Sequence, residues 1–514
     1  MGVKVDHLTK HADEIGDRIA VIDDRVGHPV REFDYVSFNG RVNALANGFL
    51  ALGASEGSHI AWWGNNSVEV LTAIHAIRKA GGVSIPIPYR STSEEALYLL
   101  GVADVEILVI ESRYVPVVEK IIDQLPKLNH IITYGGVEAD YVGKPMGEIL
   151  GSSDMPVSEG NFIGTQNMIF TSGTTGKPKG AVRKVGGEAN QFGPLLELLG
   201  WDQMESLIFL TTGPLYHSGP SGFALRSQLV GATVVTQYAF DPEDWLRLVS
   251  THAVSATFSA PTPIRRVTSL PEEIKEKYDV SSLRSLIANA APWTMKLKRA
   301  YLEDFREDSL WEVYGSTELS VCTVLAPEDQ LRKPGSCGVP APGVEIQLID
   351  ESGELISEPD VAGELYARSS ALFETYYKSH DQYLEDHRDG YQTVGDIAYV
   401  DDEGYYFICD RKKDMILTGG VNVYPAEIEN VIDDHPQVAE VAVLGIPDEE
   451  WGEAVCAIIV PLEGLEEGDI TEFARNRLSG PKVPKRIVFY PELPKTGSGK
   501  VLKRDLREQI LKDL

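Results

Sequence analysis

The sequence predicts an α/β fold, with a large N-terminal domain of helix-covered parallel and mixed sheets and a small α+β C-terminal domain. Three observations support this prediction. Strand and helix patterns alternate through about the first 335 residues, hairpin patterns follow, and a compact mixture of both ends the chain. At roughly 100–200 residues per domain, 514 residues correspond to two to four domains.

Short apolar runs alternate with amphipathic segments in the first part of the chain. Strands that alternate with helices usually pair in parallel and carry helices on the faces of their sheet. The expected strands and helices lie, in chain order, at 59–63, 68–79, 82–87, 94–100 and 106–110, and further such units span 207–235 and 256–288.

Two hairpin patterns follow. A strand at 345–349 meets a turn at 351–353 and a second strand at 363–367. A later strand at 397–400 leads through a turn into another at 405–408. Neighbouring strands joined by short turns pair antiparallel, so we expect a β-barrel-like subdomain at the end of the large domain.

The last hundred residues change pattern again, with a helix at 425–434, strands at 438–444 and 454–460, and a helix at 471–478. The charged stretch 410–414 is typical of a linker or hinge. We therefore divide the chain into a domain at 1–410 and a small domain at 411–514.

Composition excludes several classes of protein. The net charge is −30, and a protein this acidic repels nucleic acid. The sequence contains no apolar run of the ~18 residues that a membrane span needs, and no hydrophobic signal region at its start. Its four cysteines form no C-x-x-C pair, which is typical of a reducing compartment. We expect a cytoplasmic protein.

The stretch TSGTTGKPKG, at 171–180, has a composition suited to holding phosphate. Its glycines let backbone N–H groups turn toward an anion, and its hydroxyls and two lysines add donors and charge. It is not a Walker loop, because only two residues separate Gly173 from Gly176 and Lys177 precedes a proline. Composition alone leaves a flexible surface linker open.

The order of motifs along the chain identifies a family. TSGTTGKPKG resembles the signature of the adenylate-forming enzymes, which include acyl-CoA synthetases, luciferases and the adenylation domains of peptide synthetases. YGSTE at 314–318 is similar to the family's Y-G-x-T-E motif, and Gly395-Asp396 to its T-G-D motif, with Val394 in place of threonine. DRKKD at 410–414 with Gly419-Gly420 resembles the hinge, and PKTGSGK at 494–500 the C-terminal lysine motif.

The resemblance implies an ATP-dependent carboxylic acid–CoA ligase. In the family reaction a carboxylate attacks the α-phosphate of ATP to give acyl-AMP and pyrophosphate, and the thiol of coenzyme A then displaces AMP. It implies that Lys500 guides the attack, that Thr317 contacts the α-phosphate, that Glu318 binds Mg²⁺, and that His217 is an aromatic gate of the acyl pocket. These four are the predicted catalytic residues, with Glu318 the predicted metal ligand.

The resemblance also implies a nucleotide site. Its phosphate loop would supply Thr171, Ser172, Gly173, Thr174, Thr175, Gly176, Lys177 and Lys179. Asp396 and Arg411 would bind the ribose, and Tyr314 would stack on adenine. The remaining predicted nucleotide-binding residues are Ala290, Ala291, Pro292, Glu312, Val313, Gly315, Ser316, Thr317, Ile408 and Lys500.

Family members rotate their small domain between the two half-reactions, so the resemblance implies a mobile C-terminal domain with Lys413 at the hinge. Gly419 and Gly420 would then line the path of coenzyme A. The predicted acyl pocket contains Tyr216, His217, Ser336, Cys337 and Gly338. Arg183-Lys184 departs from the Thr-His pair common in relatives.

Three alternatives remain at this point. The chain is a CoA ligase for a fatty, aromatic or polycyclic acid, an adenylating enzyme that uses another acceptor such as a carrier-protein thiol, or a non-catalytic nucleotide-binding relative. Intact Lys500, Thr317 and Glu318 argue against the third alternative. The predicted partners are a small carboxylic acid, ATP and CoA, and a homodimer is left open.

Overall fold

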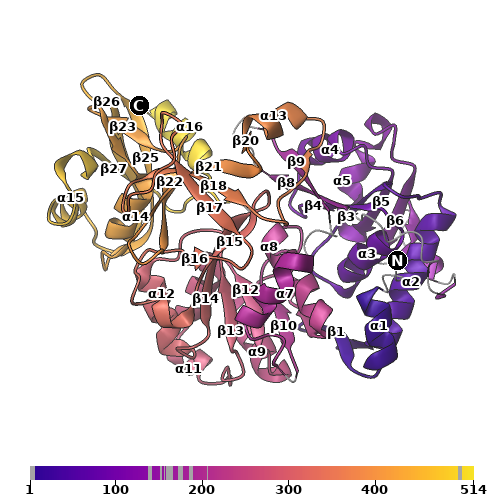
Figure 1. The fold of residues 1–514 in the computed structure, drawn as a ribbon. Coiled ribbons are helices and arrows are strands. Elements are labelled where there is room, and N and C mark those ends of the chain that lie inside the picture. Colours follow the sequence, from indigo (N-terminus) through magenta and orange to yellow (C-terminus); the bar gives the residue numbers. More distant parts are fainter. Residues whose placement is uncertain are drawn as a thin grey trace.

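Two large sheets with helices between and outside them form most of the N-terminal part of the chain (Figure 1). An antiparallel sheet and a C-terminal α+β unit follow them. The computed structural model describes residues 6–136, 142–150, 153–155, 157, 166–171, 177–184, 189–204, 206–495 and 501–513. No helix of the described residues is long and apolar enough to cross a membrane.

The first large sheet has nine strands in the order β16-β15-β14-β13-β12-β10-β11-β1-β2. The neighbouring strands β14-β13-β12-β10-β11-β1 all pair in parallel. Strand β2 at one edge and strands β15 and β16 at the other pair antiparallel. Parallel strands end at the same edge of a sheet, which brings the ends of β13 and β14 together. The strands are β1 Ile19–Asp23, β2 Arg31–Asp34, β10 Ile208–Thr211, β11 Thr233–Thr236, β12 Ala256–Ser259, β13 Ser285–Ala288, β14 Leu310–Ser316, β15 Ser320–Leu325 and β16 Val339–Pro340.

The second large sheet has eight strands in the order β19-β9-β8-β4-β3-β5-β6-β7. β8 runs parallel to β4 and antiparallel to β9, so the glycine-rich stretch joins two neighbouring strands. β19 pairs with β9 from about two hundred residues further along. The strands are β3 His59–Trp63, β4 Val83–Ile87, β5 Ile107–Glu111, β6 His130–Tyr134, β7 Lys144–Pro145, β8 Gln166–Thr171, β9 Lys179–Lys184 and β19 Thr375–Tyr376.

Helices bury the facing sides of these sheets. One core cluster joins Phe209 of the first sheet and Trp62 of the second through residues of α2, α3 and α8. In α3 the side chain of Ser67 caps the first turn at the Val70 N–H, 3.3 Å away. The helices are α1 His7–Glu14, α2 Tyr35–Ala51, α3 Val68–Lys79, α4 Ser93–Val102, α5 Val115–Glu119, α6 Met146–Leu150, α7 Ala189–Leu198, α8 Ser218–Ser227, α9 Pro242–His252, α10 Pro261–Thr268, α11 Glu272–Lys275, α12 Met295–Asp304 and α13 His380–Glu385.

The predicted hairpins form an antiparallel sheet of five strands. Its order is β17-β18-β21-β20, and β22 also pairs with β21. The antiparallel pairing is as predicted, although the pairings of the described residues follow an open path rather than a closed barrel. The strands are β17 Glu345–Ile349, β18 Gly363–Arg368, β20 His387–Arg388, β21 Tyr391–Val400 and β22 Tyr406–Arg411.

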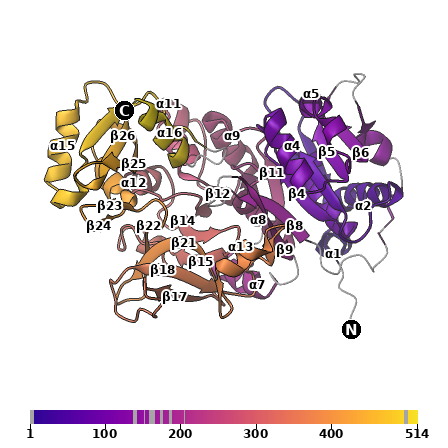
Figure 2. The ribbon, with the colours of Figure 1, turned by 90° about the horizontal axis from the view of Figure 1, so that it is seen from above.

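The C-terminal unit is a five-stranded mixed sheet with helices, and it lies beside α12 (Figure 2). The Lys296 ammonium on α12 donates to the carbonyls of Asp433 and Val438, at 3.4 and 3.2 Å. The Arg265 guanidinium on α10 donates to the Ala439 carbonyl at 2.8 Å. The elements are β23 Ile416–Thr418, β24 Val421–Val423, α14 Pro425–Asp433, β25 Val438–Asp448, β26 Gly452–Pro461, α15 Glu467–Arg475, β27 Arg486–Phe489 and α16 Lys503–Asp513.

Most predicted elements agree with the structure, and β3 and α3 have the predicted bounds. The helix predicted at 471–478 is α15, which begins at Glu467 and ends at Arg475. A reciprocal capping box between Glu466 and Asp469 fixes its start. Gly468 inside the first turn weakens the helical pattern there, which explains the late prediction.

Gly338 offers a test of this packing, because it has a φ of +98° and a Cβ there would lie 2.0 Å from the Val324 carbonyl oxygen. Gly335 also has a positive φ, +83°, but open space around it. We expect Gly335→Ala to cost about 1 kcal/mol and Gly338→Ala about 3 kcal/mol or more. Urea denaturation of both variants measures the difference, and equal losses would contradict the steric explanation.

Candidate active site

A buried carboxylate joins the start of the glycine-rich stretch to the YGSTE motif. The Thr171 hydroxyl, at the end of β8, donates to Glu318 Oε1 at 2.9 Å. The Tyr376 hydroxyl of β19 donates to the same oxygen at 3.0 Å. Glu318 is 7% exposed. Burial and the neighbouring Glu318 carboxylate raise the pKa of Tyr376, so its hydroxyl keeps the proton that it donates.

Thr317 is held from both sides. Its hydroxyl lies 2.9 Å from the Ser218 hydroxyl at the start of α8. Its carbonyl accepts a hydrogen bond from the Arg183 guanidinium at 2.8 Å. Arg183 also donates to the Ala371 carbonyl at 2.9 Å and is buried. Arg183, which stands where many relatives have threonine, therefore fixes the backbone that carries Thr317 and Glu318.

The predicted ribose and adenine residues meet near the ends of β14 and β22 and at the middle of β21. The Tyr314 hydroxyl donates to Asp396 Oδ2 at 2.6 Å, and Arg411 Nε lies 3.2 Å from Asp396 Oδ1. Asp396 and Arg411 are opposite each other in the β21–β22 pairing, and Ile408 packs near Tyr314. Burial and the nearby Asp396 carboxylate raise the pKa of Tyr314. The carboxylate is thus already positioned to accept from hydroxyls.

The small-residue segment after β13 has an unusual backbone. Ala290 has a φ of +74°, and its N–H donates to the Asn289 side chain. Asn289 in turn donates to the Val313 carbonyl at 2.6 Å, which ties the segment to β14. A left-handed alanine stores strain, and such strain is frequent at ligand-binding sites. Ala291 and Pro292 complete the segment.

The side chain of Glu312 pairs with Lys298 of α12. Burial raises the pKa of Glu312 even though Lys298 opposes the shift. In the same motif Gly315 approaches the Ser320 carbonyl so closely that a Cβ would lie 1.9 Å from its oxygen. The Ser316 hydroxyl accepts from the Leu319 N–H at 3.0 Å. These contacts hold the turn that presents Thr317.

Two lysines flank the far end of the glycine-rich stretch. Lys177 Nζ lies 5.3 Å from the centroid of the Tyr98 ring. Lys179 Nζ donates to the Gln382 side chain at 3.1 Å and lies 5.6 Å from the Tyr376 ring centroid. Both cations lie within or next to strand β9, close to aromatic faces. The predicted residues Ser172, Gly173, Thr174, Thr175 and Gly176 lie outside the described residues.

The predicted aromatic gate lies directly before α8. The Tyr216 and His217 rings are 4.3 Å apart between centroids. His217 Nε2 is buried and has no hydrogen-bond partner among the described residues. Burial lowers the pKa of His217 to about 4, so the ring is neutral at pH 7.

Ser336, Cys337 and Gly338 pack between β15 and β22. The Ser336 hydroxyl donates to the Tyr406 carbonyl at 2.9 Å, and Thr323 donates to the Cys337 carbonyl at 2.6 Å. These contacts give the three residues a structural role. Their place in an acyl pocket stays a prediction.

A pocket of about 130 Å³ opens beside Thr317, and the sequence analysis did not find it. Ser218 and Arg183, which both bond to Thr317, form part of its wall. Most of the rest comes from strands β3, β4 and β8 and helices α3 and α8, and His7 of α1, Leu215 and Leu229 complete the lining. The spacing of Ser218, Ser221 and Arg226 on one face of a helix, with a glycine at 222, was the available signal.

The C-terminal candidates are only partly described. Lys500 lies outside the described residues, whereas Val501 bridges to Lys495, which pairs with Glu440. Lys413 is exposed, and partial desolvation of its ammonium together with the neighbouring Arg411 lowers its pKa. Gly419 and Gly420 have φ values of +57° and +78° and form the two-residue turn between β23 and β24.

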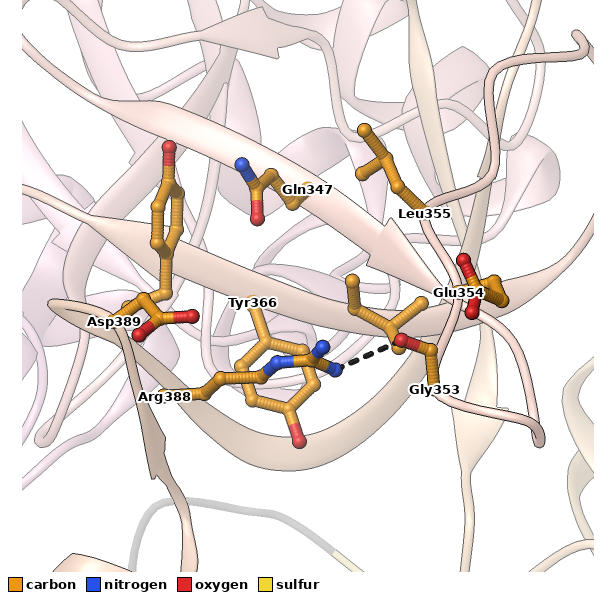
Figure 3. Close-up of a pocket in the computed structure, with 9 residues that line it drawn as sticks. Gln347, Gly353, Glu354, Leu355, Tyr366, Arg388 and Asp389 are labelled. Carbon is orange, nitrogen blue, oxygen red and sulfur yellow. Dashed lines mark hydrogen bonds between the residues drawn. The ribbon is translucent and has the colours of Figure 1, made fainter.

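Another pocket, of about 260 Å³, lies on the hairpin sheet. Figure 3 shows Arg388 reaching across it to donate to the Gly353 carbonyl, at 3.0 Å. None of the residues that line it belongs to the motifs. The reaction chemistry therefore concentrates around Glu318 and Thr317.

Comparisons with known proteins identify the family of this chain. Residues 8–377 match the model of the AMP-binding enzyme family, and residues 427–500 match that of the AMP-binding enzyme C-terminal domain. The chain therefore belongs to the AMP-binding enzyme family. The predicted fold and the predicted class of AMP-forming acid–CoA ligase are confirmed.

Several relatives are similar over nearly their whole length. The indoleacetate–CoA ligase of Aromatoleum aromaticum is 32% identical over 499 residues, covering 94% of each chain. A feruloyl-CoA synthase of Amycolatopsis is 33% identical over 494 residues, covering 94% of this chain and 95% of its own. The crystal structure of ATP-bound MatB from Rhodopseudomonas palustris matches with a TM-score of 0.86 at 26% identity, covering 98% of each chain.

The low pKa of His217 predicts an acid-sensitive fold. In the unfolded chain His217 takes up a proton near its usual pKa of 6.5, while the folded ring resists protonation down to about pH 4. Stability is therefore lost as pH falls through this window, by at most about 3 kcal/mol from this residue. We expect His217→Asn to show a shallower loss between pH 6.5 and 4.5.

Urea denaturation at several pH values measures this slope. The matched control is His28→Asn, which changes an exposed histidine and should keep the wild-type slope. An unchanged slope in His217→Asn would rule out a neutral buried ring as a source of the acid sensitivity.

Proposed function

We propose that this chain activates a small carboxylic acid with ATP and transfers the acyl group to coenzyme A. A carboxylate oxygen bonds to the α-phosphorus as the bond to the β-phosphate oxygen breaks, releasing pyrophosphate. The CoA sulfur then bonds to the acyl carbon, and AMP leaves. The observation that carries this proposal is the Thr171–Glu318 hydrogen bond, which joins the phosphate loop to the YGSTE motif.

The first half-reaction gathers negative charge, so it needs aligned donors and cations. In this proposal the stretch 171–179 holds the β- and γ-phosphates, with Lys177 and Lys179 at its end. The Thr317 hydroxyl donates to the α-phosphate. Arg183 contributes indirectly, because its bond to the Thr317 carbonyl keeps that hydroxyl in place.

The nucleoside would lie over the end of β14 and the middle of β21. Asp396 is supported by Tyr314 and Arg411, so it can accept from both ribose hydroxyls without moving. The left-handed backbone at Ala290 and the small side chains after it leave space for the adenine ring. Glu312, Val313, Gly315, Ser316 and Ile408 would complete the site as packing residues.

Magnesium fits Glu318. Mg²⁺ in nucleotide enzymes is usually bound by one or two carboxylates together with phosphates and water. Glu318 is buried, and its two hydroxyl donors both use Oε1. When bound, the ion would neutralise charge on the phosphate oxygens. Thr171 and Tyr376 would hold the carboxylate toward it.

The small domain would deliver Lys500. We place the domain boundary at 410/411, a position between the two matched family segments. Rotation about Lys413 would bring Lys500 to the carboxylate and α-phosphate for the first step. It would then bring the tight turn of Gly419 and Gly420 to the path of CoA for the second.

The pocket beside Thr317 favours small acids. A cavity of about 150 Å³ holds a benzene ring, and this pocket has about 130 Å³. A short chain or at most one ring fits in this space, which is smaller than the indole or ferulate groups named for two relatives. Four free cysteines and the net charge support a cytoplasmic setting. The homodimer stays a prediction.

Lys500→Ala should separate the two half-reactions. Without the lysine the attack on the α-phosphate loses its guiding cation, and pyrophosphate release should fall by about 10²-fold or more. Thioester formation from supplied acyl-AMP should remain within about threefold of wild type. Lys512→Ala, an exposed lysine of α16, is the control and should leave both rates unchanged. Full pyrophosphate release by Lys500→Ala would refute the assigned role.

Glu318→Gln tests the magnesium site while keeping an oxygen that accepts from Thr171 and Tyr376. Loss of the charge should raise the Mg²⁺ concentration that supports half-maximal pyrophosphate release by about tenfold or more. Glu358→Gln, the same change at an exposed glutamate outside the motifs, is the matched control and should keep the wild-type Mg²⁺ response. A wild-type Mg²⁺ response in Glu318→Gln would show that this carboxylate does not bind the ion.

A further inference from the structure

One face of α8 forms a wall of the pocket beside Thr317. Ser218, Ser221, Gly222, Leu225 and Arg226 of α8 line the pocket, and Leu229 follows just after the helix. Steps of three and four residues place them on a single helix face. At about 1.5 Å per residue, Arg226 begins about 12 Å along the axis from Ser218. The pocket therefore has a near end at Thr317 and a far end at Arg226.

Gly222 makes room for the guanidinium at the far end. A Cβ at Gly222 would lie 2.5 Å from Arg226 Nη1, so the guanidinium lies back over the helix toward Ser218. Gly222 is four residues from Ser218, and four residues of helix correspond to about 6 Å. The Arg226 guanidinium, which lies over Gly222, is therefore about 6 Å from Ser218 along the helix axis. Arg226 Cζ lies 3.5 Å from the Phe192 ring centroid, and this contact positions the group.

His7 and Arg78 add two buried donors to the same pocket. Arg78 Nη1 donates to His7 Nδ1 at 3.1 Å, and a guanidinium can only donate. His7 Nδ1 is therefore the acceptor. Burial and the adjacent Arg78 lower the pKa of His7, so its ring is neutral and its proton lies on Nε2. His7 Nε2 and Arg78 Nε are both buried with no hydrogen-bond partner among the described residues.

The described cluster of Asp6, Arg78 and Lys79 near this end carries more positive than negative charge. Arg78 and Lys79 share one carboxylate, that of Asp6, at 2.5 and 3.0 Å. That cluster carries one net positive charge inside a protein of net charge −30. His75 also lines the pocket, and its Nε2 bonds to the Gln228 side chain at 2.8 Å. The described lining residues include three arginines and no carboxylate.

We propose that the far end of this pocket binds a second carboxylate of the acid, so that small dicarboxylic acids are the preferred substrates. The second carboxylate accepts from His7 Nε2–H and from the guanidinium groups of Arg78 and Arg226. The first carboxylate lies at Thr317 and reacts. The inference rests on the proposed function and narrows its substrate class to acids with one ring or about four carbons between two carboxyl groups.

Matched pairs of acids test this proposal. The pairs are hexanoate with adipate, and phenylacetate with 4-carboxyphenylacetate, each assayed by pyrophosphate release and by thioester formation with CoA. We expect kcat/KM for each dicarboxylate to exceed that of its partner by about tenfold or more, mainly through KM. Adipate without ATP should also raise the melting temperature more than hexanoate does.

Variants locate the effect. Arg226→Met should reduce the dicarboxylate preference by about tenfold or more and leave kcat/KM for the monocarboxylate within about threefold of wild type. Arg226→Lys should restore part of the dicarboxylate preference. Gly222→Ala, which crowds the guanidinium, should reduce the preference without removing the charge. Arg266→Met, which removes an exposed arginine from α10, is the matched control and should keep the preference.

The outcomes separate the two proposals. If both monocarboxylates react as well as their dicarboxylate partners, the second carboxylate site is wrong and the ligase assignment stands. If Arg226→Met and Gly222→Ala both keep the wild-type preference, the far end of the pocket does not bind that group. If no acid of the panel releases pyrophosphate, the proposed function itself is overturned.

Discussion

The Glu318 carboxylate is the interaction on which the rest of the site depends. It accepts from Thr171 at the end of β8 and from Tyr376 in β19, so one buried oxygen joins three distant segments of the chain. A buried carboxylate without these donors would be costly, because an unpaired charge in a protein interior loses its hydration. The two hydrogen bonds that stabilise the buried Glu318 carboxylate therefore also hold the start of the glycine-rich stretch, the YGSTE motif and strand β19 together.

The surrounding contacts extend this constraint in two directions. Toward the nucleotide, Tyr314 and Arg411 hold Asp396 from two other strands. Toward the acid, Arg183 holds the Thr317 carbonyl and also lines the pocket. The groups proposed to act on phosphate, ribose and acid are thus set by the framework before any substrate binds, which is how preorganised sites reduce the cost of reaching a transition state.

The acyl side was the hardest to predict from sequence. His217 was predicted from a motif, but the pocket beside it depends on α8, where Gly222 leaves space for Arg226. His7 lies more than two hundred residues earlier. No local pattern connects a residue near the N-terminus with one face of α8, because their proximity follows from how the two large sheets pack.

The sequence by itself determined the family, the reaction class and most strands and helices, because motifs of glycine, hydroxyl and charged residues need only local chain geometry to be recognisable. It placed Thr171 and Glu318 in separate motifs. Only the tertiary structure decided that they share a hydrogen bond, that Arg183 supports Thr317, and that the pocket's far end is basic. Those facts depend on side chains brought together by sheet packing, and long-range packing leaves no periodic signal in a single sequence.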